Sequence, residues 1–356
     1  MQELKKILVI NLGGVGDFLL STPALRALRK TFPESELSLL ATERIKELAK
    51  ELSYIHEVFA FHVGYGGMMP VGKLFVNLTT LLELRARHFD IAINMRTLGT
   101  DRGARNIRRL LGIIRPKKTA GRNTEGRGLF FDVSVPEHQN GQKHEMEYDL
   151  DTVQALGAKR EDNKIDFPIE EASHHKVRCL LESEGIDPQA MLLGIHPGGI
   201  PSRRWPIENF ARVIEEIKER INCWFVITGS GSEAELGKRL KAVDPASVSN
   251  LCGRLTLKEL GALIFQCRLY ISNDTGPMHI AALFNTPLIA LFGPGDLTRY
   301  DPRVISDQAV VIYHKTECAP CDKFFCKTRP CLDRILPEEV IREALGLWGK
   351  RIQAEQ

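Results

Sequence analysis

The sequence predicts an α/β fold made of two doubly wound, Rossmann-like domains. Short apolar runs alternate with amphipathic helical stretches along most of the 356 residues, as is typical of parallel sheets covered by helices. The alternation pauses at 162–168 and resumes at Met191. Since a chain of this length can bury two cores, we expect domains at 1–168 and 169–336, followed by a helix at 337–356.

The first domain is expected to carry strands rich in Val, Ile and Leu, separated by helical periodicity. The predicted strands are 5–12, 36–41, 55–60, 89–95 and 131–135, and the predicted helices are 18–31, 43–52, 73–87 and 144–157.

The second domain repeats the pattern after a helix at 170–185. Its predicted strands are 191–195, 223–228, 269–272 and 287–292, and its predicted helices are 207–220, 233–242, 257–266 and 277–285.

Composition and charge are those of an ordinary globular protein. Apolar residues make up 43% of the chain and charged residues 26%, with a net charge of +3. No apolar run approaches the ~18 residues of a membrane-spanning helix. The N-terminus leads straight into a strand without the features of a signal peptide. These observations favour a cytoplasmic protein.

The first candidate ligand loop follows the strand at 6–12. Its sequence, Gly13-Gly14-Val15-Gly16-Asp17, lets the backbone approach a ligand closely and places a carboxylate at the mouth of the sheet. The spacing differs from the dinucleotide fingerprint, which argues against a nicotinamide oxidoreductase. An ordinary strand-to-helix turn capped by Asp17 is the alternative.

The second candidate loop, Asp274-Thr275-Gly276, lies between a buried strand and a helix that can begin at Pro277. Free N–H groups and the helix dipole would favour an anion such as a diphosphate. Asp274 and His279 could hold sugar hydroxyls, whereas the alternative role of the motif is a helix cap.

Two further loops follow strands of the second domain. Gly198 and Gly199 precede the pair Arg203-Arg204, which is either an anion site or a surface basic pair. Glu233 opens a helix after Thr228-Gly229-Ser230, where a glutamate is also favoured by the helix dipole alone.

A basic segment spans residues 96–127. It could hold an anionic partner or be a solvated loop, and it lacks the aromatic interleaving expected for nucleic-acid binding. Its cations, opposed only by Asp101 and Glu125, are Arg96, Arg102, Arg105, Arg108, Arg109, Arg115, Lys117, Lys118, Arg122 and Arg127.

A cysteine cluster lies near the C-terminus, at Cys318, Cys321, Cys326 and Cys331. Four thiolates could close a structural zinc site, but the spacing is not that of a paired zinc knuckle. Reduced thiols or labile disulfides are the alternative.

Four blocks in order resemble the heptosyltransferases of lipopolysaccharide core synthesis, glycosyltransferase family 9. They are the Asp17 loop with its helix through Thr22-Pro23-Ala24-Leu25, the stretch Gly194–Pro206, the stretch Leu251–Leu260, and Asp274–Leu283 with Pro287–Pro294. The resemblance implies a GT-B architecture, in which two domains face each other across a cleft and the last helix packs back on the first domain.

The resemblance also implies an activity: inverting transfer of a heptose from ADP-L-glycero-β-D-manno-heptose to the inner core of lipopolysaccharide, with no cofactor needed for the chemistry. The acceptor would be an anionic glycolipid, and the protein would make peripheral contact with the inner face of the cytoplasmic membrane. Nucleic acid would not be a partner. A related transferase with another nucleotide sugar or acceptor, or a non-catalytic glycolipid-binding protein, remains an alternative.

The resemblance assigns roles to individual residues. Asp17 would be the general base, and Arg203 stands where relatives usually carry a phosphate-binding lysine. The acceptor would be bound by Gly14, Arg96, Arg102 and Arg105. The donor would be bound by Gly198, Gly199, Arg203, Glu233, Asp274, Thr275, Gly276 and His279.

Overall fold

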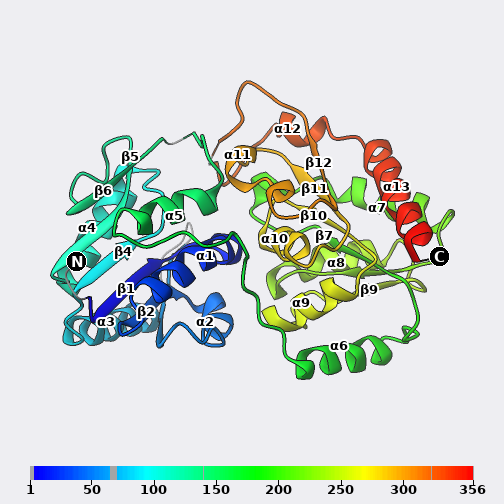
Figure 1. Cartoon of the computed structure of the whole chain (residues 1–356). Coiled ribbons are helices and arrows are strands. Elements are labelled where there is room, and N and C mark those ends of the chain that lie inside the picture. The colour runs from blue at the N-terminus through cyan, green and yellow to red at the C-terminus, as the bar shows by residue number, and fades with distance from the viewer. Residues whose placement is uncertain (1–3, 65–69, 139, 322, 356) are drawn as a thin grey trace. The chain divides into compact units, whose positions relative to one another are not determined.

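The computed structural model describes residues 4–64, 70–138, 140–321 and 323–355, with side chains up to Gly349. The chain divides into two compact units, Met1–Pro168 and Ile169–Gln356 (Figure 1). Each unit contains one six-stranded sheet in which all neighbouring strands are parallel. The predicted α/β class with two doubly wound domains is confirmed.

The sheet of the first unit has the order β3-β2-β1-β4-β5-β6. β1 lies centrally, with Val9 opposite Leu39 on one side and Ile93 on the other. The chain order therefore reverses between β1 and β4, and ligands bind at the carboxyl ends of the strands at such a point. The elements are β1 (Lys6–Asn11), α1 (Val15–Thr31), β2 (Glu36–Thr42), α2 (Glu43–Ala49), β3 (Glu57–Phe61), α3 (Val71–Ala86), β4 (Ile91–Asn94), α4 (Asp101–Ile114), β5 (Lys118–Thr124), β6 (Val133–Glu137) and α5 (Glu145–Gln154).

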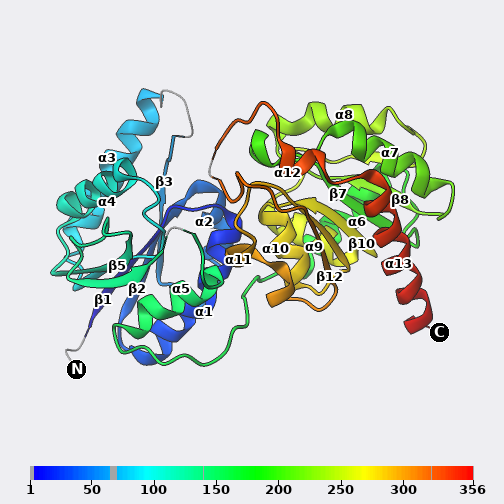
Figure 2. The ribbon, with the colours of Figure 1, turned by 90° about the horizontal axis from the view of Figure 1, so that it is seen from above.

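Helices cover both faces of this sheet. Figure 2 shows α3 and α4 on one face and α1 and α5 on the other. The core under α3 and α4 contains Leu8 and Ile10 of β1, Leu84 of α3 and Leu111 of α4. Because β1 is apolar on both faces, it can occupy the centre of a sheet covered from both sides.

The sheet of the second unit has the order β12-β11-β10-β7-β8-β9, so the reversal lies between β7 and β10, where Ile195 is opposite Ile271. Its elements are α6 (Glu171–Ser183), β7 (Leu192–His196), η1 (Pro201–Arg203), α7 (Ile207–Lys218), β8 (Trp224–Ile227), η2 (Gly231–Glu233), α8 (Ala234–Lys241), β9 (Val248–Asn250), α9 (Leu257–Gln266), β10 (Leu269–Asn273), α10 (Gly276–Leu283), β11 (Leu288–Phe292), α11 (Leu297–Tyr300), η3 (Pro302–Val304), β12 (Ala309–Tyr313), α12 (Pro330–Asp333) and α13 (Pro337–Glu355).

The final helix, α13, packs within the second unit. Val340, Ala344 and Trp348 are buried in the same core cluster as Trp205, and α13 contacts α7. The guanidinium of Arg268 lies over the Trp348 ring at 5.4 Å from its centroid. The apolar face of α13 is thus buried in the second unit, and the expected return of the last helix to the first domain stays a prediction.

The sequence missed two elements in the basic segment, α4 and β5. α4 begins at Thr100, whose Oγ1 accepts a hydrogen bond from Gly103 N at 3.0 Å. Its buried residues, Ala104, Leu110, Leu111 and Ile114, share one face, and the arginines lie on the other; the run of arginines led to its interpretation as a basic segment instead of a helix. The short strands β9 and β12 were missed as well. Within the described residues, no helix is long and apolar enough to span a bilayer.

Candidate active site and donor site

The first candidate site lies at the reversal point of the first sheet, where α1 begins. Asp17, in the first turn of α1, accepts a hydrogen bond through Oδ2 from Gly14 N at 2.7 Å. A Cβ at Gly13 would come within 2.6 Å of Oδ2 of Asp17, so only glycine lets the loop fold over the carboxylate. The Asp17 side chain is 16% exposed. It is thus both held in place and reachable from solvent, as a general base must be.

The neighbouring strand supplies the counter-ion of Asp17. Arg96 follows β4, and its Nη1 lies 2.5 Å from Asp17 Oδ1 and 3.3 Å from Glu145 Oε1. The acid is therefore fixed from two sides, by a backbone amide and by a guanidinium. Resemblance gave Arg96 a role in acceptor binding; the structure adds that this side chain already bridges Asp17 and a buried glutamate.

Behind Arg96 lies a buried ionic cluster centred on Arg122 of β5. Nη1 of Arg122 lies 2.7 Å from Glu145 and 3.1 Å from Glu137, and Nη2 pairs with Asp149. Burial, and Glu145 beside it, raise the pKa of Asp149 to about 7 although Arg122 opposes this. A buried cation surrounded by carboxylates must be fully paired to be tolerated.

An anion-binding stretch and a solvated loop were the alternatives for the basic segment, and neither describes all of it. Arg122 is 1% exposed and belongs to the interior, whereas Arg102 and Arg105 are exposed on α4. The structure brings Arg96 to Asp17, and it places Arg102 and Arg105 on a helix that begins at the same edge of the sheet. Acceptor binding by Gly14, Arg96, Arg102 and Arg105 stays a prediction.

The second candidate site lies at the reversal point of the second sheet. Asn273, at the end of β10, donates to Gly198 O at 3.0 Å through Nδ2 and accepts from Trp205 N at 3.2 Å through Oδ1. This buried side chain fastens the loop after β7 to the loop after β10. Asn273 directly precedes Asp274, but it was not among the residues predicted from the sequence.

Gly199 lies where the two loops touch. Its φ is +116°, and a Cβ there would lie 2.6 Å from Thr275 Cγ2. Both the backbone angle and the close approach require glycine. Thr275 is the N-cap of α10, and its hydroxyl donates to Asn273 O at 3.2 Å. The loop with Gly198 and Gly199 therefore meets the loop with Thr275 and Gly276; donor binding by these four residues stays a prediction.

Glu233 ties these loops together. Its carboxylate accepts from Gly199 N at 2.7 Å and Ser230 N at 2.7 Å, and Arg204 Nη2 lies 3.3 Å away. Burial works to raise the pKa of Glu233, but the amides of Gly199 and Ser230 outweigh it and lower the pKa. A Cβ at Gly198 would come within 2.4 Å of Glu233 Oε1. Glu233 is thus a loop-bridging and helix-capping residue; ribose binding by it stays a prediction.

Arg203 and Asp274 form an ion pair in this site, with Nη1 2.9 Å from Oδ2. Asp274 is 3% exposed. A Cβ at Gly295 would lie 1.9 Å from Asp274 Oδ2, so the loop after β11 also closes on this carboxylate. Sequence reasoning placed Arg203 on phosphate and Asp274 on sugar, and the structure shows that the two groups are neighbours.

His279 of α10 is 2% exposed, and its ring lies edge-on to Tyr300 at 6.1 Å between centroids. It is therefore buried between α10 and α11. Its predicted contact with donor hydroxyls is not tested by this packing.

His196, at the end of β7, is a buried histidine of structural character. Its Nδ1 lies 3.2 Å from Thr228 Oγ1. Burial lowers the pKa of His196 to about 4, so the ring is neutral in the folded protein.

This pKa predicts an acid-dependent loss of stability. Between about pH 6.5 and 4 the unfolded state binds the extra proton, so stability falls as the pH drops. From pH 7 to 5 the loss should be about 2 kcal/mol. Urea unfolding followed by tryptophan fluorescence measures it, because all three tryptophans lie in the second unit. His196→Asn should remove most of this loss; an identical pH dependence in the variant would contradict the assignment.

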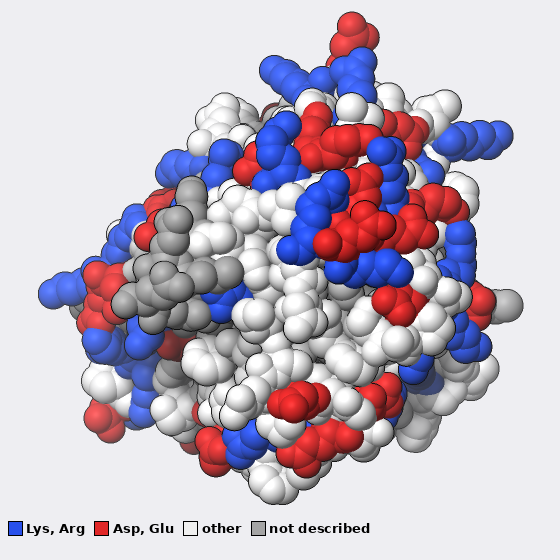
Figure 3. Space-filling view, turned by 90° about the vertical axis from the view of Figure 1, so that its right-hand side faces the viewer, with Lys and Arg blue, Asp and Glu red and all other residues white. Residues whose placement is uncertain are grey.

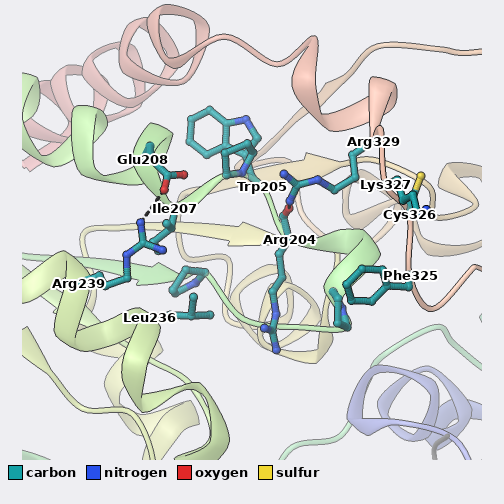
Figure 4. A pocket seen from close by; sticks show the side chains of 13 residues that line it. Arg204, Trp205, Ile207, Glu208, Leu236, Arg239, Phe325, Cys326, Lys327 and Arg329 are labelled. Carbon is teal, nitrogen blue, oxygen red and sulfur yellow. Dashed lines mark hydrogen bonds and ion pairs between the residues drawn. The ribbon is translucent and has the colours of Figure 1, made fainter.

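A pocket of about 570 Å³ lies beside the loop that carries Arg203 (Figure 4). It adjoins the donor residues through Arg204, whose Nε donates to Gly199 O at 2.7 Å, but it is not lined by Arg203 or Asp274. Arg329 Nη1 donates to Arg204 O at 3.1 Å and Arg239 pairs with Glu208. Its lining is Pro197, Pro201, Arg204, Trp205, Pro206, Ile207, Glu208, Leu236, Arg239, Phe325, Cys326, Lys327 and Arg329.

The four clustered cysteines are free thiols. Cys331 is buried, Cys318 is exposed, and Cys321 and Cys326 are half-buried. Across the described ranges, no group of three or more Cys, His, Asp or Glu side chains is placed to hold a metal ion. The geometry thus gives no support to the predicted structural zinc.

In a comparison with known protein families, the family model "Glycosyltransferase family 9 (heptosyltransferase)" matches residues 80–331 of this chain. The chain is 26% identical to lipopolysaccharide heptosyltransferase 2 of Salmonella typhimurium, over 97% of this chain and 99% of that protein. It is 32% identical to a Campylobacter jejuni lipooligosaccharide heptosyltransferase 2, where the match covers 44% of this chain and only half of that protein's length.

Solved structures agree with this match at the level of fold. Escherichia coli heptosyltransferase II superposes with a TM-score of 0.74 at 21% identity, covering 99% of this chain and all of that one. An E. coli heptosyltransferase solved with ADP gives 0.65 at 17% identity, covering 96% of this chain and 99% of that one. Because the family model matches well over half of the sequence, the chain belongs to glycosyltransferase family 9.

Proposed function

We propose that this protein is an inverting heptosyltransferase of lipopolysaccharide inner-core synthesis, with ADP-L-glycero-β-D-manno-heptose as donor and an anionic Kdo-lipid A or heptosyl-core glycolipid as acceptor. The observation that carries the proposal is that each sheet has candidate site residues at the point where its strand order reverses. In the first unit this residue is Asp17, whose carboxylate is held by hydrogen bonds and is still exposed to solvent. In the second unit two glycine-containing loops meet beside Arg203. Family membership supports the choice of heptose.

In the proposed reaction an acceptor hydroxyl oxygen attacks C1 of the heptose. The bond from C1 to the β-phosphate oxygen breaks, ADP leaves with the electron pair, and Asp17 takes the hydroxyl proton. Attack from the face opposite the leaving group inverts the anomeric centre. Asp17 is suited to this role because Gly14 N and Arg96 fix its orientation.

Charge on the departing diphosphate needs compensation. Arg203 and the N-terminus of α10 at Thr275 supply it, since a guanidinium can bind two phosphate oxygens at once. This arrangement uses protein groups alone, so we expect transfer to persist in EDTA.

A direct assay tests the proposal. The purified chain is incubated with the nucleotide-heptose and Kdo-lipid A or heptosyl-Kdo-lipid A, and ADP release and the mass of the glycolipid are followed. A gain of one heptose in the glycolipid is the expected result. UDP- and GDP-hexoses serve as controls, and transfer from one of them with none from ADP-heptose would replace the proposed donor. Absence of transfer from every donor, with ADP still bound, would favour a non-catalytic glycolipid-binding protein.

The Arg203–Asp274 pair predicts opposite effects of two substitutions on ADP binding. Arg203→Ala should weaken ADP affinity, whereas Arg203→Lys should keep much of it, because the diphosphate then still meets a cation. Asp274→Ala should leave ADP affinity equal or higher, since Asp274 competes for Arg203, but should impair binding of the intact nucleotide-heptose. Calorimetry with both ligands measures this. Equal losses of ADP and nucleotide-heptose affinity in Asp274→Ala would remove its sugar-binding role.

A further inference from the structure

Helix α3 carries an apolar stripe that faces solvent. Its members fall within an arc of about 100° when residues are spaced at 3.6 per turn, and they are 51% to 81% exposed. An ordinary surface helix turns such a face toward the core. The stripe consists of Val71, Leu74, Phe75, Leu78 and Leu82.

The core-facing side of α3 is a different one. Asn77, Leu81 and Leu84 are its buried residues. Asn77 accepts from His62 N at 2.8 Å and donates to His62 O at 2.9 Å, which fixes the helix against the end of β3. The rotation of α3 about its axis is therefore set by these contacts, and the stripe is left outside the core.

Positive charge lies next to the stripe. α3 and α4 pack side by side on one face of the first sheet (Figure 2), and Arg85 Nη1 of α3 donates to Ile113 O of α4 at 3.4 Å. Ile113 is itself 37% exposed. The outer face of α4, which we call the arginine face, carries Arg102, Arg105, Arg108 and Arg109, all exposed and, in the described part of the chain, without a carboxylate partner.

This arrangement differs from the face of the molecule drawn in Figure 3. On the face shown in Figure 3, lysine and arginine side chains lie beside aspartate and glutamate. A partner for this surface must bury the apolar side chains of the stripe and, at the same time, place negative charges beside the exposed arginines. The surface of an anionic bilayer supplies both.

We propose that the α3 stripe and the arginine face form a membrane-docking surface, with the apolar side chains inserted at the level of the acyl-chain boundary and the arginines at anionic head groups. The proposal rests on the proposed function in one respect, that the acceptor resides in a bilayer. A second copy of this chain is a poorer occupant, because a symmetric contact between stripes would bring two arginine faces close together.

Vesicle partitioning of the full chain tests the proposal. Vesicles of zwitterionic phospholipid, with and without anionic phosphatidylglycerol, contain no glycolipid acceptor. The protein should bind the anionic vesicles more tightly, and added salt should weaken this binding. Phe75→Gln with Leu78→Gln keeps the charge of α3 and should lower the partition coefficient about tenfold or more, since two large apolar side chains lose their insertion. Arg108→Gln with Arg109→Gln should lower it by on the order of tenfold on anionic vesicles only.

Two exposed apolar residues of the second unit serve as the control for nonspecific hydrophobic binding to vesicles. Val304 and Leu336 are 54% and 52% exposed in the second unit, and Val304→Gln with Leu336→Gln should leave partitioning unchanged. ADP affinity, which reports the folded second unit, and the helical circular dichroism signal should be equal in all variants.

Any of three results would overturn the proposal. The unchanged protein could fail to bind the vesicles, or Phe75→Gln/Leu78→Gln could bind them as tightly as the unchanged protein. The third result is a dimer of the unchanged protein in analytical ultracentrifugation that becomes monomeric in this double variant. The vesicles carry no acceptor, so these results do not depend on heptosyl transfer. Conversely, transfer to a detergent-dispersed acceptor tests the proposed activity without the bilayer.

Discussion

Asp17→Asn should lower the turnover number by about 10²–10⁴-fold, the contribution usual for a general base. The asparagine oxygen can still accept the hydrogen bond that Asp17 Oδ2 receives from Gly14 N, so the loop keeps its shape. What is lost is the ability to take a proton. Donor binding should be unaffected because the residues predicted for it lie in the second unit. Steady-state kinetics with saturating ADP-heptose, together with ADP affinity, gives the measurement.

The split between kcat and KM separates the two roles considered for Asp17. A base contributes to the chemical step, so kcat should fall while the KM for the acceptor changes little. A residue that only orients the acceptor would mainly raise that KM. Near-normal kcat in Asp17→Asn would exclude the base role. Arg96→Gln is the companion variant: it removes the guanidinium that lies 2.5 Å from Asp17 but leaves the carboxylate, so its kcat should fall less.

Arg122→Met should destabilise the first unit by about 3–5 kcal/mol. The substitution keeps most of the side-chain volume, but it leaves Glu137, Glu145 and Asp149 buried together without their cation. Removing one partner of a buried ion pair costs about this much, because the remaining charges stay desolvated.

The distribution of tryptophan makes this effect separable. All three tryptophans lie in the second unit. In urea unfolding, circular dichroism should therefore show an early transition for the first unit of Arg122→Met, while tryptophan fluorescence keeps its original midpoint. Arg108→Met, on the exposed face of α4, is the control and should stay within about 0.5 kcal/mol. Equal stability of both variants would mean that the buried cluster contributes little.

The loops of the site could be located from the sequence because their signals are local. A buried strand, a glycine turn and a helix start follow one another at Gly13–Asp17 and at Asp274–Gly276. In a doubly wound sheet such turns gather at the carboxyl edge. The parallel register of β1 with β4 and of β7 with β10 then brings Arg96 to the first loop and Gly198–Gly199 to the second.

The partners of these side chains could not be found in this way. Glu233, for which ribose binding and a helix-dipole role were the alternatives, receives the amide of Gly199, 34 positions earlier in the chain. Arg203 and Asp274, assigned to different parts of the donor, are paired with each other. A side chain's partner depends on how strands are ordered in the sheet, and a motif does not contain that information.

By itself, then, the sequence determined the α/β class, the two doubly wound domains and the loops that carry the candidate residues, since hydrophobic periodicity and turn chemistry act between near neighbours. Only the tertiary structure decided which charges are buried and which apolar faces are exposed. Arg122 is buried because β5 brings it into the interior, although most other cations of the basic segment are exposed. The apolar stripe of α3 is exposed because Asn77, Leu81 and Leu84 are the residues that face the core. Burial is a property of the packed unit, because each residue's surroundings come from segments distant in the chain.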